Sequence, residues 1–158
     1  MIEGHARVLG DFVNTDLLFT NKYDDRGQSL DEIAERAAQN VPGLQRGDVL
    51  VAGTNFGATS SRELAIKVMR KLGVSAVLAK SFTRLLYRNA INNGLYALVC
   101  DTSEIRDGDL VRVEPSSGRV AVPERGITLE TSPLPPFLAS LVEAGGLLPY
   151  VRLHPDWQ

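Results

Sequence analysis

The stretch DVLVAGTNFGATSSRELAIKVMRKLG, residues 48–73, joins a buried strand to an amphipathic helix. Residues 49–52 are apolar without alternation, as expected of a strand that is covered on both faces. Apolar residues then recur at helical spacing before a C-terminal Gly73 cap, at Leu64, Ala65, Val68, Met69 and Leu72. The stretch therefore predicts one strand–helix unit of an α/β fold.

The same unit recurs directly after this stretch. SAVLA, residues 75–79, indicates a second buried strand, and SFTRLLYRNAINNG, residues 81–94, indicates a second helix. Residues 96–100 are typical of a third strand. Strands that alternate with helices favour a mostly parallel sheet with flanking helices.

The N-terminal flank is less regular. Residues 5–9 indicate a first strand, whereas residues 10–28 are rich in turn-forming residues and are predicted to be a long loop without a helix. Ser29 and Glu32 have the spacing of a capping box, which predicts a helix over residues 30–39.

The C-terminal part of the chain has a pattern typical of strands rather than of alternating strands and helices. Residues 108–122 alternate around Ser117-Gly118, which predicts a β-hairpin, and residues 127–131 favour a further strand. PPFLASLVEAGG, residues 135–146, is typical of a helix that begins at proline, and the rest is predicted to be an irregular tail. We find no repeat and no linker, so the chain is predicted to be one domain.

The composition limits the possible functions. The 158 residues are 44% hydrophobic and 23% charged, as in an ordinary globular protein, and the net charge of −2 argues against nucleic acid or an anionic membrane as a partner. The opening MIEGHARVLGD lacks a long apolar run, so neither a secretory signal nor a membrane span is expected. We therefore expect a cytoplasmic protein.

Metal ligands are scarce in this chain. Cys100 is the single cysteine, which excludes an internal disulfide and a cysteine-rich metal site built from this chain alone. His5 and His154 are the only histidines and lie far apart in the sequence. We predict no metal site, and we interpret Cys100 as an inert core thiol.

The polar turn between strand and helix allows two interpretations. Ser60 and Glu63 have capping-box spacing, so the turn could serve only to begin the helix. Alternatively, the helix start would lie at the carboxyl edge of the sheet, where Gly53 and Gly57 would let the backbone approach a bound anion. Arg62 favours the second interpretation, because a cation in a first helical turn is unfavourable unless an anion lies beside it.

The bound anion is more simply a carboxylate than a phosphate. The turn lacks the Lys-Ser/Thr ending of a P-loop and the glycine spacing of a dinucleotide site. A guanidinium would bind either a carboxylate or a phosphate in two places, and a carboxylate fits the turn at least as well. Asn14-Thr-Asp16 in the first loop is, taken alone, typical of a turn.

Taken together, several segments resemble one family: GDFVNTD, NKY, GTNFGATSSRE, AVLAKSFTRLLYRNAINNGL and the PPF helix. The chain is similar, over roughly residues 8–150, to the small subunits of 3-isopropylmalate dehydratases, and more broadly to the swivelling domain of the aconitase superfamily, including homoaconitase small subunits. The resemblance implies that residues 1–158 form a single swivelling β/β/α domain of that type, with a mostly parallel sheet, flanking helices and a C-terminal hairpin region.

The resemblance also implies site residues. Ser60 matches the catalytic serine of the family, an alkoxide base for a carbon-bound proton, and Thr15 and Asp16 match its active-site Thr-Asp pair. The substrate-binding residues expected are Ser61, Arg62, Asn55, Gly57 and Arg26. Arg26 lies in the loop that helps to choose the substrate in the family, and we hypothesise that it contacts an extra carboxylate or other polar substituent.

The chain departs from the family pattern at three positions, Leu17, Thr59 and Leu64. Apolar residues at positions 17 and 64 make the expected site more apolar. These departures therefore bear on which substrate is bound more than on which reaction is catalysed.

The family implies a partner. Its large subunit carries an iron–sulfur cluster, here expected to be [4Fe–4S], which one cysteine could not hold. This chain is then expected to bind no cofactor itself and to be active only with that large subunit. The expected substrate is a hydroxy di- or tricarboxylic acid, most simply 2-isopropylmalate in leucine biosynthesis. Homoaconitate, dimethylmalate, methylcitrate and aconitate remain open, as does a non-catalytic module that binds a carboxylate or phosphate.

Overall fold

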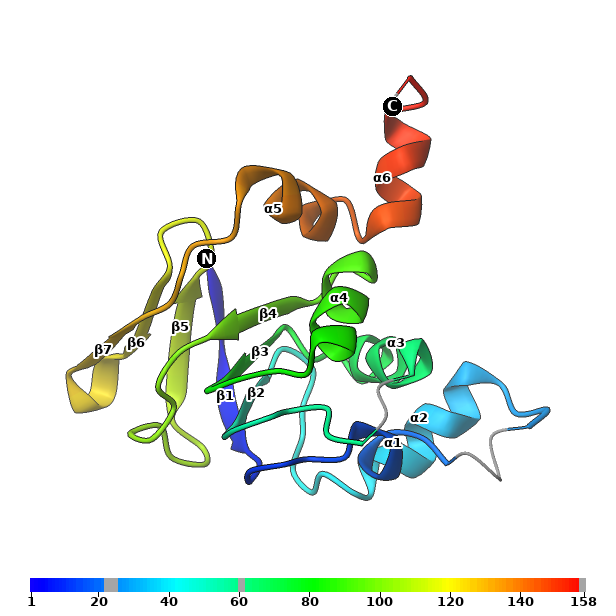
Figure 1. Cartoon of the computed structure of the whole chain (residues 1–158). Coiled ribbons are helices and arrows are strands. Elements are labelled where there is room, and N and C mark those ends of the chain that lie inside the picture. The colour runs from blue at the N-terminus through cyan, green and yellow to red at the C-terminus, as the bar shows by residue number, and fades with distance from the viewer. Residues whose placement is uncertain (22–25, 60–61, 157–158) are drawn as a thin grey trace.

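The computed structural model describes residues 1–21, 26–59 and 62–156 (Figure 1). The strands are β1 (Ile2–Val8), β2 (Val49–Ala52), β3 (Ala76–Ala79), β4 (Tyr96–Val99), β5 (Leu110–Glu114), β6 (Arg119–Val122) and β7 (Ile127–Glu130). The helices are α1 (Thr15–Leu18), α2 (Leu30–Ala38), α3 (Glu63–Lys71), α4 (Arg84–Asn92), the 3₁₀ turn η1 (Pro123–Arg125), α5 (Pro136–Glu143) and α6 (Leu147–Leu153).

The strands form one seven-stranded sheet in the order β4-β3-β2-β1-β5-β6-β7. β1 to β4 are parallel, with Leu50 of β2 beside Val77 of β3, whereas β1, β5, β6 and β7 are antiparallel. The predicted α/β class is confirmed, but the sheet expected to be mostly parallel is mixed, because the antiparallel strands β5, β6 and β7 belong to it as well. The C-terminal hairpin strands continue the same sheet on the other side of β1, so β1 joins the two halves.

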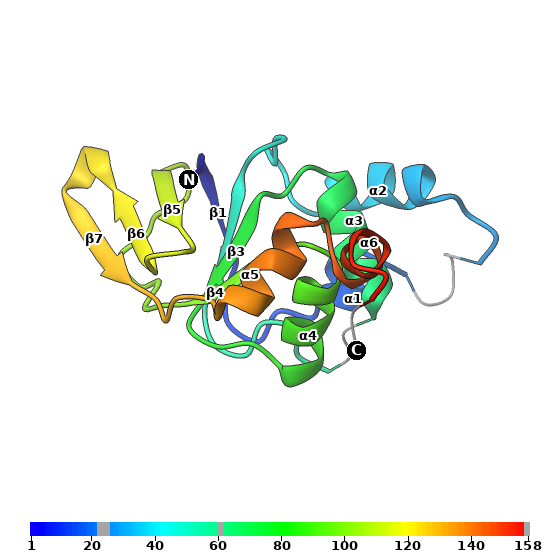
Figure 2. The ribbon, with the colours of Figure 1, turned by 90° about the horizontal axis from the view of Figure 1, so that it is seen from above.

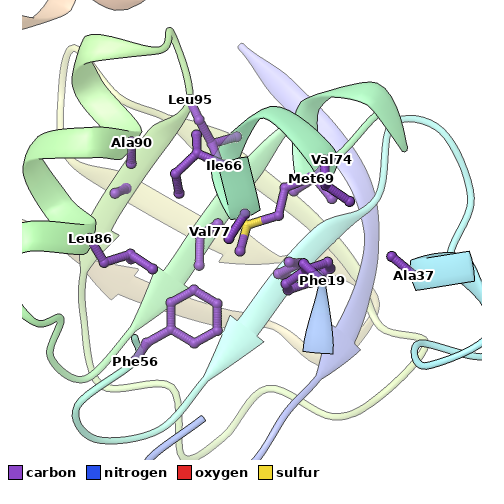
Figure 3. Close-up of a cluster of buried hydrophobic side chains, with 14 of the residues drawn as sticks. Phe19, Ala37, Phe56, Ile66, Met69, Val74, Val77, Leu86, Ala90 and Leu95 are labelled. Carbon is purple, nitrogen blue, oxygen red and sulfur yellow. The ribbon is translucent and has the colours of Figure 1, made fainter. Parts of the chain in front are cut away.

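Helices and strands pack into two apolar clusters on opposite sides of the parallel strands. Leu50 points into a cluster with residues of α2, α3 and α4, which Figure 3 shows, while its neighbours Val49 and Val51 point into a second cluster with residues of α5. Figure 2 shows α5 over the strands and α2 and α3 beside each other. Coverage on both sides explains the unbroken apolar runs in β2 and β3.

Two expectations for irregular segments were wrong. The predicted long loop contains the short helix α1, because the Asn14 side chain accepts hydrogen bonds from the amides of Asp16 and Leu17 and so caps a single turn. The predicted irregular tail contains α6, where the ring of Tyr150 packs edge-to-face on Phe137 of α5 at 5.7 Å. Figure 1 shows α6 projecting from the body near the C-terminus.

The other predicted helices and strands are present within a few residues of their expected ends. The capping box of α2 is formed by Ser29 and Glu32, and the hydrogen bonds from Ser29 hold the pKa of the Glu32 carboxyl below its ordinary value. In the part of the chain that the structure describes, none of the helices has the length and apolar character to cross a membrane.

Candidate active site

The site is built at the carboxyl ends of the parallel strands, where the loop after β1 meets the loop after β2. The amide nitrogens of Gly57 and Ala58 both donate to the carbonyl oxygen of Val13, at 3.0 and 3.1 Å. The amide of Phe12 donates to the carbonyl of Thr54 at 2.8 Å. These backbone bonds fix the first loop, with α1, against the second loop, which leads into α3.

Two phenylalanines anchor these loops in the core. Phe19 follows α1 and Phe56 lies in the second loop, and both are 0% exposed in the cluster shown in Figure 3. Burying an aromatic ring of this size is among the larger single contributions to packing. The polar residues beside these rings are therefore held by the core.

Asp16 and Arg62 meet at the start of α3. The Asp16 Oδ1 atom accepts a hydrogen bond from the backbone amide of Arg62 at 3.3 Å and lies 3.6 Å from Nε of the same residue. Their side chains are 14% and 32% exposed, so the ion pair is partly shielded from water. The structure thus joins two residues that the sequence interpretation assigned to the site separately.

Thr20 adds a contact that the sequence interpretation missed. Nη2 of Arg62 donates to Thr20 Oγ1 at 2.5 Å, and this hydroxyl donates to the carbonyl oxygen of Asp16 at 3.0 Å. A threonine within a polar loop carries no pattern that would single it out. Only the approach of Arg62 from a distant part of the chain reveals it.

Thr15 has a buried hydroxyl. The residue is 0% exposed, and among the described residues its Oγ1 has no hydrogen-bond partner. An unpaired buried hydroxyl costs free energy unless a water molecule or a ligand satisfies it. Thr15 precedes Asp16, so this hydroxyl belongs to the same turn of α1 as the ion pair.

The loop of residues 54–59 has an unusual backbone. Asn55, Gly57 and Thr59 all have positive φ angles, of 56°, 90° and 73°. The amide of Asn55 donates to Ser81 Oγ at 2.8 Å, and Thr83 Oγ1 donates to the carbonyl of Gly57 at 3.2 Å. The substrate-binding roles predicted for Asn55 and Gly57 stay predictions, but the loop that carries them is fixed from both sides.

The start of α3 differs from the predicted capping box. The N-cap residue is Arg62, without a capping hydrogen bond from its side chain, and Glu63 pairs with Lys67 at 3.0 Å. The helix therefore begins later than the Ser60 cap would place it, and Arg62 stands before the first turn. Ser60 and Ser61 lie outside the described residues, so their predicted roles stay predictions.

Gly53 and Arg26 were also expected near the bound anion or substrate. Gly53 allows a close approach, but to the Asp11 side chain: a Cβ at this glycine would collide with that carboxylate, which accepts from the Thr54 amide at 2.6 Å. Arg26 lies exposed on the turn before α2, and its role stays a prediction.

A hollow of about 220 Å³ lies at the same edge of the sheet, lined in part by Gly10, Asp11, Gly53, Lys80 and Thr102. Gly53 is the only described residue of the predicted anion-binding turn that lines it, and Asp16, Asn55, Gly57 and Arg62 do not.

The described residues do not fit an iron–sulfur cluster. Among them, no group of three or more His, Cys, Asp or Glu side chains gathers at one place. Burial, assisted by the charge of Asp101, raises the pKa of the Cys100 thiol to about 11, so this thiol is poorly suited to act as a thiolate ligand.

Comparison with known proteins agrees with the geometry. The profile of the aconitase C-terminal domain family matches residues 5–103. A 3-isopropylmalate dehydratase small subunit of Halothermothrix orenii is 37% identical, with 96% of this chain and 95% of the relative covered. A homoaconitase small subunit of Methanocaldococcus jannaschii is 35% identical, with 96% of this chain and 92% of the relative covered.

A solved structure extends this likeness to three dimensions. The crystal structure of a 3-isopropylmalate dehydratase from Methanocaldococcus jannaschii superposes with a TM-score of 0.89 at 34% identity, over 98% of this chain and 95% of that one. The chain therefore belongs to the aconitase C-terminal domain family and, within it, to the group of 3-isopropylmalate dehydratase small subunits.

Proposed function

We propose that this chain is the small subunit of a heteromeric hydro-lyase that isomerises a hydroxy di- or tricarboxylic acid by dehydration and rehydration. The observation that carries the proposal is the meeting of Asp16 and Arg62. A guanidinium held by a carboxylate suits an anionic and oxygen-rich substrate. Thr15, the residue before Asp16, adds a buried hydroxyl that has no partner among the described residues. The names of the relatives make 2-isopropylmalate, converted to 3-isopropylmalate in leucine biosynthesis, the leading substrate.

Arg62 binds a carboxylate of the substrate in this proposal. Asp16 orients the guanidinium through its Oδ1 atom, which also holds the backbone amide of Arg62. The Thr15 hydroxyl, buried in the same turn, hydrogen-bonds the substrate or a water molecule beside it. Ser61, Asn55 and Gly57 complete the substrate contacts as the family resemblance implies.

Ser60 acts as the base. Its oxygen removes the proton from the substrate carbon, the electrons of that C–H bond form the carbon–carbon double bond, and the hydroxyl leaves the neighbouring carbon. Water then adds to the alkene with the two positions exchanged, and the serine returns the proton. A serine oxygen needs nearby positive potential to act as a base, and Arg62, which stands before α3, lies two positions further along the chain.

The partner supplies what this chain lacks. We assign a [4Fe–4S] cluster to the large subunit, where it would activate the departing hydroxyl as a Lewis acid. This assignment is supported by the term "small subunit" in the names of the relatives and by the poor fit of the described residues to such a cluster. The chain would act as one swivelling domain that closes the site.

A tricarboxylic acid such as homoaconitate is the second candidate substrate. It is favoured by the relative named homoaconitase small subunit and by Arg26, an exposed cation on the turn before α2 that could contact a further carboxylate. Replacing Arg26 with alanine should then weaken the preference for the larger acid. An unchanged preference among acids would remove Arg26 from the site.

The central experiment is turnover by the chain, alone and mixed with its large subunit reconstituted under anaerobic conditions. A panel of hydroxy di- and tricarboxylic acids is followed by the ultraviolet absorbance of the alkene. We expect turnover only in the mixture, with the preferred acid identifying the substrate. A verified complex with an intact cluster that turns over none of the acids would contradict the proposal.

Ser60→Ala separates catalysis from simple binding. We expect this variant to bind the acid but to lose turnover, whereas Ser117→Ala, a change at an exposed serine of the hairpin, should behave as wild type. Wild-type turnover by Ser60→Ala would instead show that Ser60 is not the base.

A further inference from the structure

Thr20 is a buried polar residue beside the site. It is 4% exposed, and it follows Phe19, which is fully buried and points into the core cluster of Figure 3. A threonine at this depth needs partners for its hydroxyl. Both of its partners are residues of the proposed site.

The direction of each hydrogen bond is fixed by chemistry. A guanidinium has only donors, so in the 2.5 Å contact with Arg62 Nη2 the Thr20 oxygen must accept. The hydroxyl proton is then given to the carbonyl oxygen of Asp16, 3.0 Å away. This carbonyl lies in α1, a single turn whose carbonyls have few partners within the helix. Thr20 therefore links the end of α1 to the guanidinium.

The two contacts define the orientation of Arg62. Asp16 Oδ1 lies 3.6 Å from Nε, and Thr20 Oγ1 lies 2.5 Å from Nη2 of the same planar group. The 3.6 Å ionic contact at Nε is longer than a hydrogen bond and constrains the plane weakly, whereas the hydrogen bond from Nη2 to Thr20 constrains its direction. Bidentate binding of a carboxylate depends on that plane.

We propose that Thr20 is a positioning residue for substrate binding, because its hydroxyl holds the Arg62 guanidinium in the plane in which it receives a substrate carboxylate. The proposal rests on the proposed function, since it requires Arg62 to bind the substrate. Thr20 itself need not touch the substrate. Its effect should therefore appear in the apparent affinity for the acid and should pass through Arg62.

The first test is Thr20→Val in the complex with the large subunit. Valine keeps the shape of threonine but removes the hydroxyl, so we expect KM to rise about tenfold, the effect of roughly one hydrogen bond to a charged group, while kcat changes by less than about twofold. Thr20→Ser keeps the hydroxyl and should return KM to within about twofold of wild type. A wild-type KM in Thr20→Val, or a serine variant as impaired as valine, would overturn the proposal.

Thr102→Val is the matched control. Thr102 is also buried, and its hydroxyl donates to the carbonyl of Ala52 at 2.7 Å, so the same change removes a similar buried hydrogen bond. We expect Thr102→Val to lower the melting temperature with KM unchanged. A rise in KM equal to that of Thr20→Val would show that general loosening, and not Arg62, is responsible.

A double mutant tests the route of the effect. If Thr20 acts through the guanidinium, Thr20→Val should change KM by less than about twofold in an Arg62→Lys background, because lysine has no planar guanidinium to orient. If the changes in KM caused by the two substitutions were fully additive, the result would contradict the proposal.

Should Thr20→Val fold poorly, Thr20→Ala carries the same expectation. Failure of the wild-type complex to turn over any acid would instead count against the proposed function, so the two failures are distinguishable.

Discussion

Phe19→Ala should destabilise the protein strongly, since Phe19 connects the core to the site. Its side chain is 0% exposed and lies in the cluster that α2, α3 and the sheet share. Removing a fully buried phenylalanine ring costs about 3–5 kcal/mol through lost burial and the cavity left behind. For a chain of this size, about 2–4 °C of melting temperature is lost per kcal/mol, so we expect a fall of roughly 6–20 °C.

Thermal and urea unfolding, followed by circular dichroism, measure this loss directly. Phe12→Ala is the matched control, because Phe12 lies on the same loop but is 63% exposed, and its replacement should lower the melting temperature by less than about 3 °C. The reasoning is refuted if Phe19→Ala melts within about 3 °C of wild type, or if both variants lose the same amount.

Three further predictions concern Asp16, Gly53 and Cys100. Asp16→Asn in the complex should lower kcat/KM at least about tenfold in steady-state kinetics, because Arg62 loses its ionic partner. Asp31→Asn, which removes an exposed ion pair with Lys71, should leave kcat/KM unchanged. Equal effects of the two changes would show that the pair of Asp16 and Arg62 is incidental. Gly53→Ala should cost about 1–3 kcal/mol in urea unfolding, since a Cβ there meets the Asp11 carboxylate, and wild-type stability would disprove that crowding. Burial raises the pKa of the Cys100 thiol from 9.0 to about 11. At pH 8 this thiol should therefore react with iodoacetamide about 100-fold more slowly in the native protein than in urea, and the native rate should rise as the pH approaches 11. Equal rates in the two conditions would show that the Cys100 thiol is in contact with solvent.

Much of the fold could be predicted from local patterns. β2, β3 and the helices α2, α3 and α4 follow from apolar spacing and caps because their residues are neighbours in the sequence. α1 and α6 escaped prediction, since each is too short for a periodic pattern. α1 depends on the Asn14 cap, and α6 packs through Tyr150 on Phe137 of α5.

The site was predicted as a set of residues but not as an arrangement. Asp16 was assigned by resemblance, and Arg62 by resemblance and by its place at the helix start. Their direct contact was not foreseen, and the first turn of α3 was placed too early. Local rules allowed a capping box at Ser60. The structure places the N-cap at Arg62, the residue whose amide donates to Asp16.

The sequence by itself determined the alternation of buried strands and amphipathic helices, the scarcity of metal ligands and the likeness to one family, because each depends on residue type and short spacing. Only the tertiary structure decided that Thr20 contacts Arg62, since the two residues are separated by 42 positions and no local pattern links them. Their approach results from two loops that meet at the carboxyl edge of the sheet and are anchored there by Phe19 and Phe56. The position of a side chain at this edge is set by the packing beneath it.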